Sequence, residues 1–194
     1  MIRILKSLIF LWIIYLSSCT IKDKSSSNKK TILTEVKQYS FEVDSAWKSM
    51  LQSDDIKISN ILRLIEELKL IDGTSEIKLK SLTEEANNLK AIRYNIESIR
   101  NSKLIDKYDS VTNKVFFETK EEINKNPNAE KYQIISQLVS EIQMADDSVI
   151  IYRKNYDKKV DNFNSFKKKN IKKLNDLKSG ESQIPEYSLF RLIP

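Results

Sequence analysis

Apolar residues recur along the chain at alternating steps of three and four, the spacing that places side chains on one face of an α-helix. The first such series is formed by Val36, Tyr39, Val43, Ala46 and Met50. A polar cluster, Ser53-Asp54-Asp55, interrupts the pattern and can either cap a new helix or bend a long one. A second series follows, formed by Ile58, Ile61, Ile65 and Leu68. The pattern therefore predicts two helices, or one bent helix, before Gly73.

The segment Gly73-Thr74-Ser75 is the strongest break in the first half of the chain. Glycine accepts the left-handed conformation of a helix C-cap, and the hydroxyl groups can cap the helix that follows. The next series is formed by Leu82, Ala86, Leu89, Ile92, Ile96 and Ile99. The spacing allows a continuation through Leu104, Tyr108, Val111 and Val115, with interruptions at Asn101-Ser102 and Asp109-Ser110.

Asn126-Pro127 marks a clear boundary, because the residue before a proline is pushed away from helical backbone angles. The longest series comes after it, formed by Ile135, Leu138, Ile142, Ala145, Val149, Tyr152, Tyr156, Val160 and Phe163. The spacing allows this helix to run on to Ile171 and Leu174 before Ser179-Gly180 ends it.

Long helices that each carry one apolar stripe must bury those stripes against one another. The predicted fold is therefore all-α, an antiparallel bundle of three or four long helices over residues 31–180. A parallel coiled-coil dimer is the competing arrangement, but the breaks at Gly73 and Pro127 favour a chain that folds back on itself. The apolar tail, residues 181–194, is bracketed by prolines, so we expect it to lie extended along the bundle. A docking segment for a partner is the alternative role of this tail.

The N-terminus has the layout of a secretory signal peptide over residues 1–18. Arg3 and Lys6 precede an uncharged apolar stretch from Leu8 to Leu16. That stretch is shorter than the roughly 20 residues that cross a bilayer as a helix, so a permanent transmembrane anchor is the weaker alternative.

The segment Leu16-Ser17-Ser18-Cys19 resembles the bacterial lipobox, in which a leucine and small residues direct lipidation of the following cysteine. The resemblance implies that Cys19 becomes the acylated first residue and holds the mature chain at a membrane. An ordinary signal peptide, with Cys19 as a small buried residue, is the alternative. Residues 19–30 are mostly lysine, serine and asparagine without apolar periodicity, which predicts a flexible tether.

Composition narrows the choice of function. The chain has no histidine and one cysteine, so a Ser-His-Asp triad, a Cys-His dyad and an internal disulfide each lack a required residue. We predict no catalytic residue, no metal site and no cofactor. Removing residues 1–18 takes away two basic groups and no acidic one, so the formal charge of +6 falls to +4. So mild a charge does not indicate nucleic acid as a partner.

Two stretches resemble the LemA family of bacterial membrane-associated helical proteins. The family's Val-x-x-Ala-Trp pattern is matched by Val43, Ala46 and Trp47. A longer pattern in the last helix is matched, without a gap, by Pro127, Leu138, Glu141, Ile142, Asp146, Arg153, Tyr156, Val160, Phe163 and Asn164. The family's usual Phe-Pro after that helix is absent. The resemblance implies an antiparallel helical bundle at a membrane with no established enzymatic activity.

Three further features are candidate functional elements. Arg153 lies seven residues after Asp146 on the predicted last helix. It can join Asp146 and Asn164 in a buried polar network. We expect instead that its side chain snorkels at the edge of the stripe. Trp47 flanks the first stripe and is expected in the core rather than as a ligand platform. Lysines gather near the end of the last helix, namely Lys167, Lys168, Lys169, Lys172 and Lys173. They suit the helix dipole and solubility, or they contact anionic lipid headgroups or an acidic polysaccharide.

The leading hypothesis is a lipid-anchored bacterial envelope protein of LemA type, a non-catalytic helical scaffold whose partner is another envelope protein. The alternative is a surface-exposed helical adhesin that uses the five lysines to bind anionic host ligands.

Overall fold

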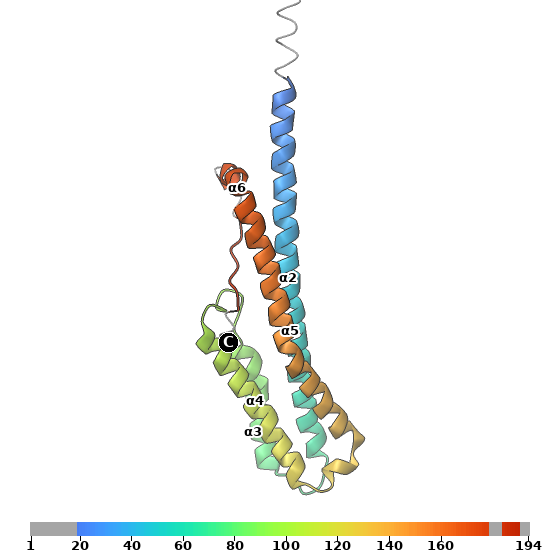
Figure 1. Ribbon diagram of the computed structural model, residues 1–194. Coiled ribbons are helices and arrows are strands. Elements are labelled where there is room, and N and C mark those ends of the chain that lie inside the picture. The colour runs from blue at the N-terminus through green and yellow to red at the C-terminus, as the bar shows by residue number, and fades with distance from the viewer. Residues whose placement is uncertain (1–18, 179–183, 191–194) are drawn as a thin grey trace, which may run out of the picture. The chain divides into compact units, whose positions relative to one another are not determined.

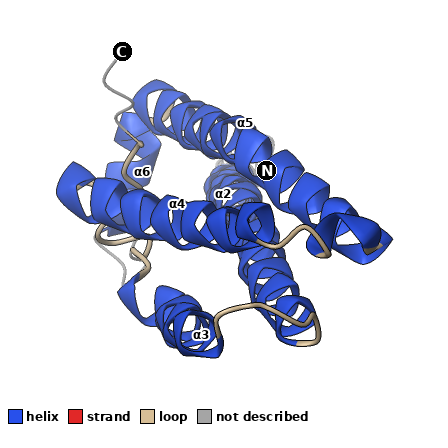
Figure 2. Ribbon diagram, turned by 90° about the horizontal axis from the view of Figure 1, so that it is seen from below, coloured by secondary structure: helices blue, strands red, loops and turns tan. Residues whose placement is uncertain are grey.

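The computed structural model describes residues 19–178 and 184–190, with side chains described over 30–175 and 184–190. Its elements are α2 (Cys19–Lys69), α3 (Glu76–Ile92), α4 (Ser102–Lys125), the 3-10 helix η1 (Ala129–Lys131), α5 (Gln133–Lys169) and α6 (Ile171–Lys178). These ranges contain helices and connecting loops but no strand (Figure 1, Figure 2). The predicted all-α class, a bundle of long helices, is confirmed. The predicted signal peptide, residues 1–18, lies outside the described residues.

The chain divides into two compact units. Among the described residues, the first unit comprises 19–42, 162–178 and 184–185, and the second unit comprises 43–161 and 186–190. Helices α2 and α5 each contribute residues to both units, so the core of each unit is described separately.

In the first unit, the beginning of α2 packs against the end of α5. Ile32 is buried, and the Tyr39 ring stacks on the ring of Phe166 with centroids 4.8 Å apart. Helix α5 ends at Lys169, where the expected continuation to Leu174 is interrupted, and the separate helix α6 then buries Leu174.

In the second unit, one continuous apolar cluster fills the space between the helices near their connecting turns. Helices α3 and α4 lie side by side there (Figure 1, Figure 2), joined at the surface by ion pairs of Lys78 with Glu118 and of Lys114 with Glu85. The buried members of the cluster are Ile61, Leu64, Ile65, Leu68, Ile71, Leu79, Leu82, Ala86, Val115, Ala129, Ile135, Leu138 and Ile142. The second series predicted for α2, the start of the α3 series and the first turns of α5 therefore do face a common core.

The predicted helix boundaries at Gly73 and at Asn126-Pro127 are confirmed, and the side chain of Asn126 connects the two turns. Gly73 has a φ of 90°, a left-handed value that side chains with a Cβ rarely adopt, and the Ser75 hydroxyl accepts a hydrogen bond from the Lys78 backbone N–H at the start of α3. Asn126, just before Pro127, donates from its side-chain amide to the Asp72 carbonyl at 2.9 Å. The α4–η1 connection is thereby fastened to the α2–α3 turn.

Helix α2 corrects one expectation and decides between two alternatives. It runs unbroken from Cys19 to Lys69, so the backbone of residues 19–30, expected to form a flexible tether, is helical. The Ser53-Asp54-Asp55 cluster likewise lies within the helix rather than ending it. Neither stretch contains glycine or proline, and extending an existing helix is far easier than nucleating one. No helix in the described part of the chain combines the length and apolar content needed to cross a bilayer.

Two of the four positions expected for α4, Tyr108 and Val115, are buried, whereas the other two are replaced by their neighbours. Leu104 is exposed and Val111 only half-buried, whereas the buried positions are Ile105, Tyr108, Thr112, Val115, Thr119 and Glu122. This set keeps the alternating step of three and four, but half of its members are polar. Thr112 and Thr119 satisfy their hydroxyls on backbone carbonyls four residues earlier in the helix, which lets them occupy buried positions.

The stripe on α5 is also incomplete in its middle. Ala145, Val149 and Tyr152 are half-buried, although the residues before and after them in the series are fully buried. The cause is a hollow in the second unit that all three residues line.

Candidate functional site

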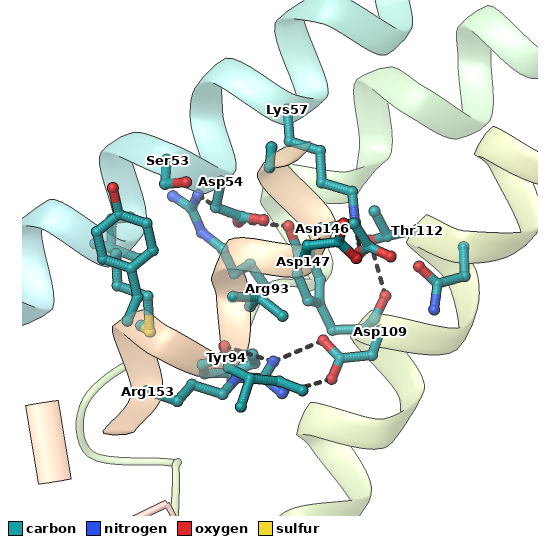
Figure 3. Close-up of a pocket in the computed structure, with 18 residues that line it drawn as sticks. Ser53, Asp54, Lys57, Arg93, Tyr94, Asp109, Thr112, Asp146, Asp147 and Arg153 are labelled. Atoms are coloured by element: carbon teal, nitrogen blue, oxygen red, sulfur yellow. Dashed lines mark hydrogen bonds and ion pairs between the residues drawn. The ribbon is translucent and has the colours of Figure 1, made fainter. Parts of the chain in front are cut away.

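The second unit contains a cavity of about 360 Å³ that we call the charged cavity. Its walls come from α2, from the residues after α3, from α4 and from α5 (Figure 3). The lining residues used below are Met50, Asp54, Lys57, Arg93, Tyr94, Tyr108, Asp109, Asn113, Asp146, Asp147, Val149, Ile150, Tyr152 and Arg153. A volume of this size lies at the lower end of the range of small-molecule sites.

The charged cavity gathers the most buried cations of the described chain. Lys57 and Arg153 are the only cations that are fully buried among the described residues, and both line it. Arg93, whose side chain is 16% exposed, is the next least exposed cation among the salt bridges of these residues, and it lines the cavity too. Buried charge is costly unless it is paired, so each of these cations needs a partner.

Arg153 on α5 is held by α4 and by the residues after α3. Its two terminal nitrogens donate to the Asp109 carboxylate at 2.8 and 2.7 Å, and one of them also donates to the Tyr94 hydroxyl at 3.0 Å (Figure 3). Burial by itself would lower the pKa of Arg153, but the bonds to Asp109 outweigh it and raise the pKa above its usual value. The guanidinium is therefore a permanent cation at neutral pH.

Arg93, at the C-cap of α3, joins two adjacent acids of α2. Its Nη1 donates to Asp54 at 3.0 Å and to Asp55 at 2.9 Å, and the Tyr108 hydroxyl of α4 donates to the same Asp54 oxygen. Burial raises the pKa of Tyr108 well above its usual value, and the neighbouring Asp54 charge adds to the effect. Burial opposes ionisation of Asp55, but hydrogen bonds from Arg93 and Lys90 lower the pKa of its carboxyl below the usual value.

Lys57 on α2 reaches across the cavity to Asp146 on α5, with which it forms an ion pair (Figure 3). The lysine side chain is 9% exposed and the aspartate 44% exposed, so the pair runs from the interior toward the rim. Asp147, the next residue of α5, is exposed and also lines the cavity.

The alternative given for Arg153, a buried polar network, is thus present, but with partners other than Asp146 and Asn164. The expectation that Arg153 snorkels at the edge of the stripe is wrong, because its side chain is only 6% exposed. Asp146 pairs with Lys57, and the partner of Arg153 is Asp109. Asn164 lies further along α5 in the first unit, where it is half-buried.

Beside the charged cavity, residues 186–190 form what we call the C-terminal strap. Phe190 is buried among the rings of Trp47, Tyr94 and Tyr156, with centroid distances of 6.2, 5.8 and 5.5 Å. The Arg153 guanidinium lies 5.4 Å from the centroid of the Phe190 ring, a cation–π distance.

Polar contacts also hold the strap. The Phe190 backbone N–H donates to Asp157 at 2.8 Å, and the Ser188 hydroxyl accepts from Arg100 at 2.6 Å. Residues 186–190 have no helix or strand and contact the second unit. That the whole tail lies extended along the bundle stays a prediction, because residues 181–183 and 191–194 lie outside the described residues.

The residues singled out from the LemA resemblance separate into groups. Trp47, Arg153 and Tyr156 meet around Phe190, and Trp47 is half-buried in this aromatic cluster rather than fully buried in the core. The Tyr156 hydroxyl is buried with no hydrogen-bond partner among the described residues, and burial raises its pKa. Pro127 lies in the connection between α4 and η1, away from this cluster in sequence.

The other predicted sites lie outside the charged cavity. Cys19 begins α2, but its side chain is outside the described side chains. In the first unit, Lys168, Lys169, Lys172 and Lys173 are exposed. Lys167 is half-buried, with its ammonium 5.1 Å from the centroid of the Phe163 ring.

The sequence pattern did not reveal Asp54, Lys57, Arg93 and Asp109 as site residues. Lys57 stands beside the apolar Ile58, and Tyr94 and Tyr108 lie on either side of the interruption at Asn101-Ser102. Charged residues next to apolar positions were therefore the only feature of the sequence that could have pointed to this site. Although four of the lining residues are aspartates, no three His, Cys, Asp or Glu side chains in the described part of the chain converge as metal ligands do.

Comparison with known proteins leaves the chain without an assigned family. No family model, no curated protein and no solved structure matches it. The resemblance to LemA proteins therefore remains a prediction from the sequence.

Proposed function

We propose that this chain is a lipid-anchored, non-catalytic binding protein of the bacterial envelope, in which acylated Cys19 provides the membrane attachment and the second unit binds a partner. The observation that carries the binding role is the charged cavity, where both fully buried cations of the described residues meet. Buried ion pairs stabilise a fold weakly, so their concentration around one hollow favours a recognition site.

The arrangement of charges suits binding better than bond-breaking chemistry. Lys57, Arg93 and Arg153 each hold a carboxylate of another segment in place. A carboxylate occupied in this way is a poor general base, because at least one of its oxygens is already hydrogen-bonded to a cation. The same pairing fixes the positions of the remaining donors and acceptors, which is what selective binding needs.

The membrane attachment is tested by replacing Cys19→Ala and following the protein in fractionated cells that receive an alkyne-labelled fatty acid. The wild-type chain should carry the label and sediment with membranes. The variant should lose both, because each buried methylene of an acyl chain contributes about 0.8 kcal/mol to membrane attachment. Ser17→Ala is the matched control, since it keeps a small residue before the cysteine. A Cys19→Ala chain that stays in the membrane fraction would remove lipidation from the proposal.

The binding role is tested with photo-crosslinking residues at two exposed positions of the second unit. Asn113 borders the charged cavity, whereas Lys80 on α3 does not. In living cells, crosslinks should form from position 113 and not from position 80. Equal crosslinking from both positions would show that the cavity is not the binding surface.

Exposure of the lysines in the first unit supports a second candidate, binding of anionic ligands. Four of these lysines are open to solvent. Replacement of all five by glutamine should abolish any salt-sensitive binding to heparin. A control with Lys37, Lys48, Lys80, Lys103 and Lys107 changed to glutamine removes the same charge from other exposed positions. Equal loss in both variants would indicate that net charge, rather than this cluster, attracts the polymer.

A further inference from the structure

We propose that the charged cavity binds a small, uncharged, hydroxyl-rich molecule, of the class of monosaccharides and polyols. This inference rests on the proposed binding role of the second unit and names its ligand. It follows from the charge balance, the remaining hydrogen-bonding capacity and the apolar part of the lining.

The charge balance of the lining disfavours a simple ion. Three cations, Lys57, Arg93 and Arg153, stand against four carboxylates, of Asp54, Asp109, Asp146 and Asp147. An anion entering the cavity would meet carboxylates that already neutralise the cations, and a cation would meet three positive groups, two of them buried. A neutral ligand meets neither penalty.

The lining still has hydrogen-bonding capacity of both kinds. Lys57 carries three N–H donors, and among the described residues its hydrogen bond is to Asp146 alone. Arg93 uses Nη1 for both of its ion pairs, which leaves its Nε and Nη2 hydrogens.

The acceptors complement these donors. Asp146 uses Oδ1 for Lys57, and Asp54 uses Oδ2 for both Arg93 and Tyr108, so each carboxylate retains its second oxygen. A hydroxyl group donates and accepts at once, so neighbouring hydroxyls on one molecule match such alternating groups. A ligand with only donors or only acceptors would leave part of the lining unsatisfied.

The remaining lining is apolar and aromatic. Met50, Val149 and Ile150 line the cavity together with the half-buried ring of Tyr152. These groups offer a surface for the C–H faces of a sugar ring, and a cavity of about 360 Å³ has room for a molecule of that size.

The first experiment measures thermal unfolding of the full chain in a detergent without a sugar headgroup. The probes are glucose, galactose, mannose, N-acetylglucosamine and sorbitol, compared with glycine, spermidine and inorganic phosphate, all at millimolar concentrations. A neutral probe should raise the Tm in a saturable manner, and the rise should persist at high salt because no net charge is bound. A rise produced only by charged probes, or by none of the probes, would overturn the inference.

The second experiment separates binding from folding. The double variant Lys57→Met with Asp146→Leu replaces an ion pair by apolar side chains of similar size, an exchange that is often neutral or stabilising. The variant should unfold at a Tm equal to or above that of the wild type and should bind the neutral probe at least tenfold more weakly. Unchanged binding in a folded double variant would show that this pair takes no part in recognition.

A milder variant keeps every ion pair of the charged cavity. Tyr152→Leu changes the aromatic wall of the cavity, whereas Tyr132→Leu changes a tyrosine that is 46% exposed and does not line it. Binding should weaken for the first and not for the second. If no sugar or polyol binds while position 113 still crosslinks a cellular partner, the ligand class fails and the proposed binding role survives.

Discussion

The inward-facing positions of the second unit carry apolar side chains at one level of the bundle and charged or polar side chains at another. Near the Gly73 and Pro127 turns, facing positions of α2, α3, α4 and α5 carry aliphatic side chains and form one dry cluster. At the level of Arg153, equivalent inward positions carry Lys57, Arg93 and Tyr108, and the helices enclose a cavity. The same helical period therefore builds a core at one level and a hydrogen-bonded hollow at the other.

The difference separates stability from specificity. Burying a leucine contributes about 1.5–3 kcal/mol, whereas a buried ion pair is often no better than an apolar pair of similar volume. The apolar level should therefore supply most of the folding free energy of the second unit. The cavity level should supply defined geometry, since each cation bridges two segments.

The largest expected effect comes from truncating the apolar level. Leu138→Ala removes a fully buried side chain of α5 and should lower the free energy of unfolding by about 3 kcal/mol, the sum of lost transfer energy and a residual cavity. Urea denaturation measures the change. Leu70→Ala, at a position 78% exposed, is the control and should change the stability little. Similar losses for both variants would contradict the assignment of the core.

The sequence predicted the buried positions of this core better for some helices than for others. Where a stripe is purely aliphatic, as from Ile58 to Leu68, period and burial agree, because only one helical face can be buried. On α4 the buried face contains Thr112 and Thr119, whose hydroxyls bond to the backbone. An apolar count therefore selected Val111 in place of its buried neighbour Thr112.

The candidate site was less predictable for a different reason. Arg153 was visible as a charge at a stripe position, but whether it snorkels or is buried depends on Asp109 and Tyr94, 44 and 59 residues earlier in the chain. Sequence spacing can place two residues on one face of one helix, as it did for Asp146 and Arg153. It cannot rank partners that other helices bring nearby.

A second, smaller effect is expected where the C-terminal strap meets the cavity level. Phe190→Ala removes contacts with three aromatic rings and with Arg153, and should lower the free energy of unfolding by about 2 kcal/mol, less than a core truncation because the strap can detach. Phe117→Ala on α4, at a position 62% exposed, is the matched control. Loss of near-ultraviolet circular dichroism from Trp47 in the first variant alone would locate the change. A neutral Phe190→Ala would mean that the strap covers the aromatic cluster without stabilising it.

The smallest expected effect is a pH dependence of the folding stability, which tests the electrostatic level of the bundle. In the folded chain, Arg93 and Lys90 lower the pKa of Asp55, so the folded state binds this proton less readily than the unfolded state does. The resulting stabilisation is fully present above the unfolded pKa of about 3.9 and is lost as pH falls through the lower folded pKa. Asp55→Asn should therefore cost less than about 1 kcal/mol at neutral pH, as for other partly exposed pairs, and nothing once the wild-type carboxyl is protonated.

Urea midpoints measured from neutral to strongly acidic pH test this convergence, with the exposed Asp106→Asn as control. The penalty of Leu138→Ala should stay constant over the same range, because no ionisable group takes part in it. If the penalty of Asp55→Asn also stayed constant with pH, the side chain would act through packing. The contrast between an apolar level and an electrostatic level of the bundle would then fail at the residue where it is most directly measured.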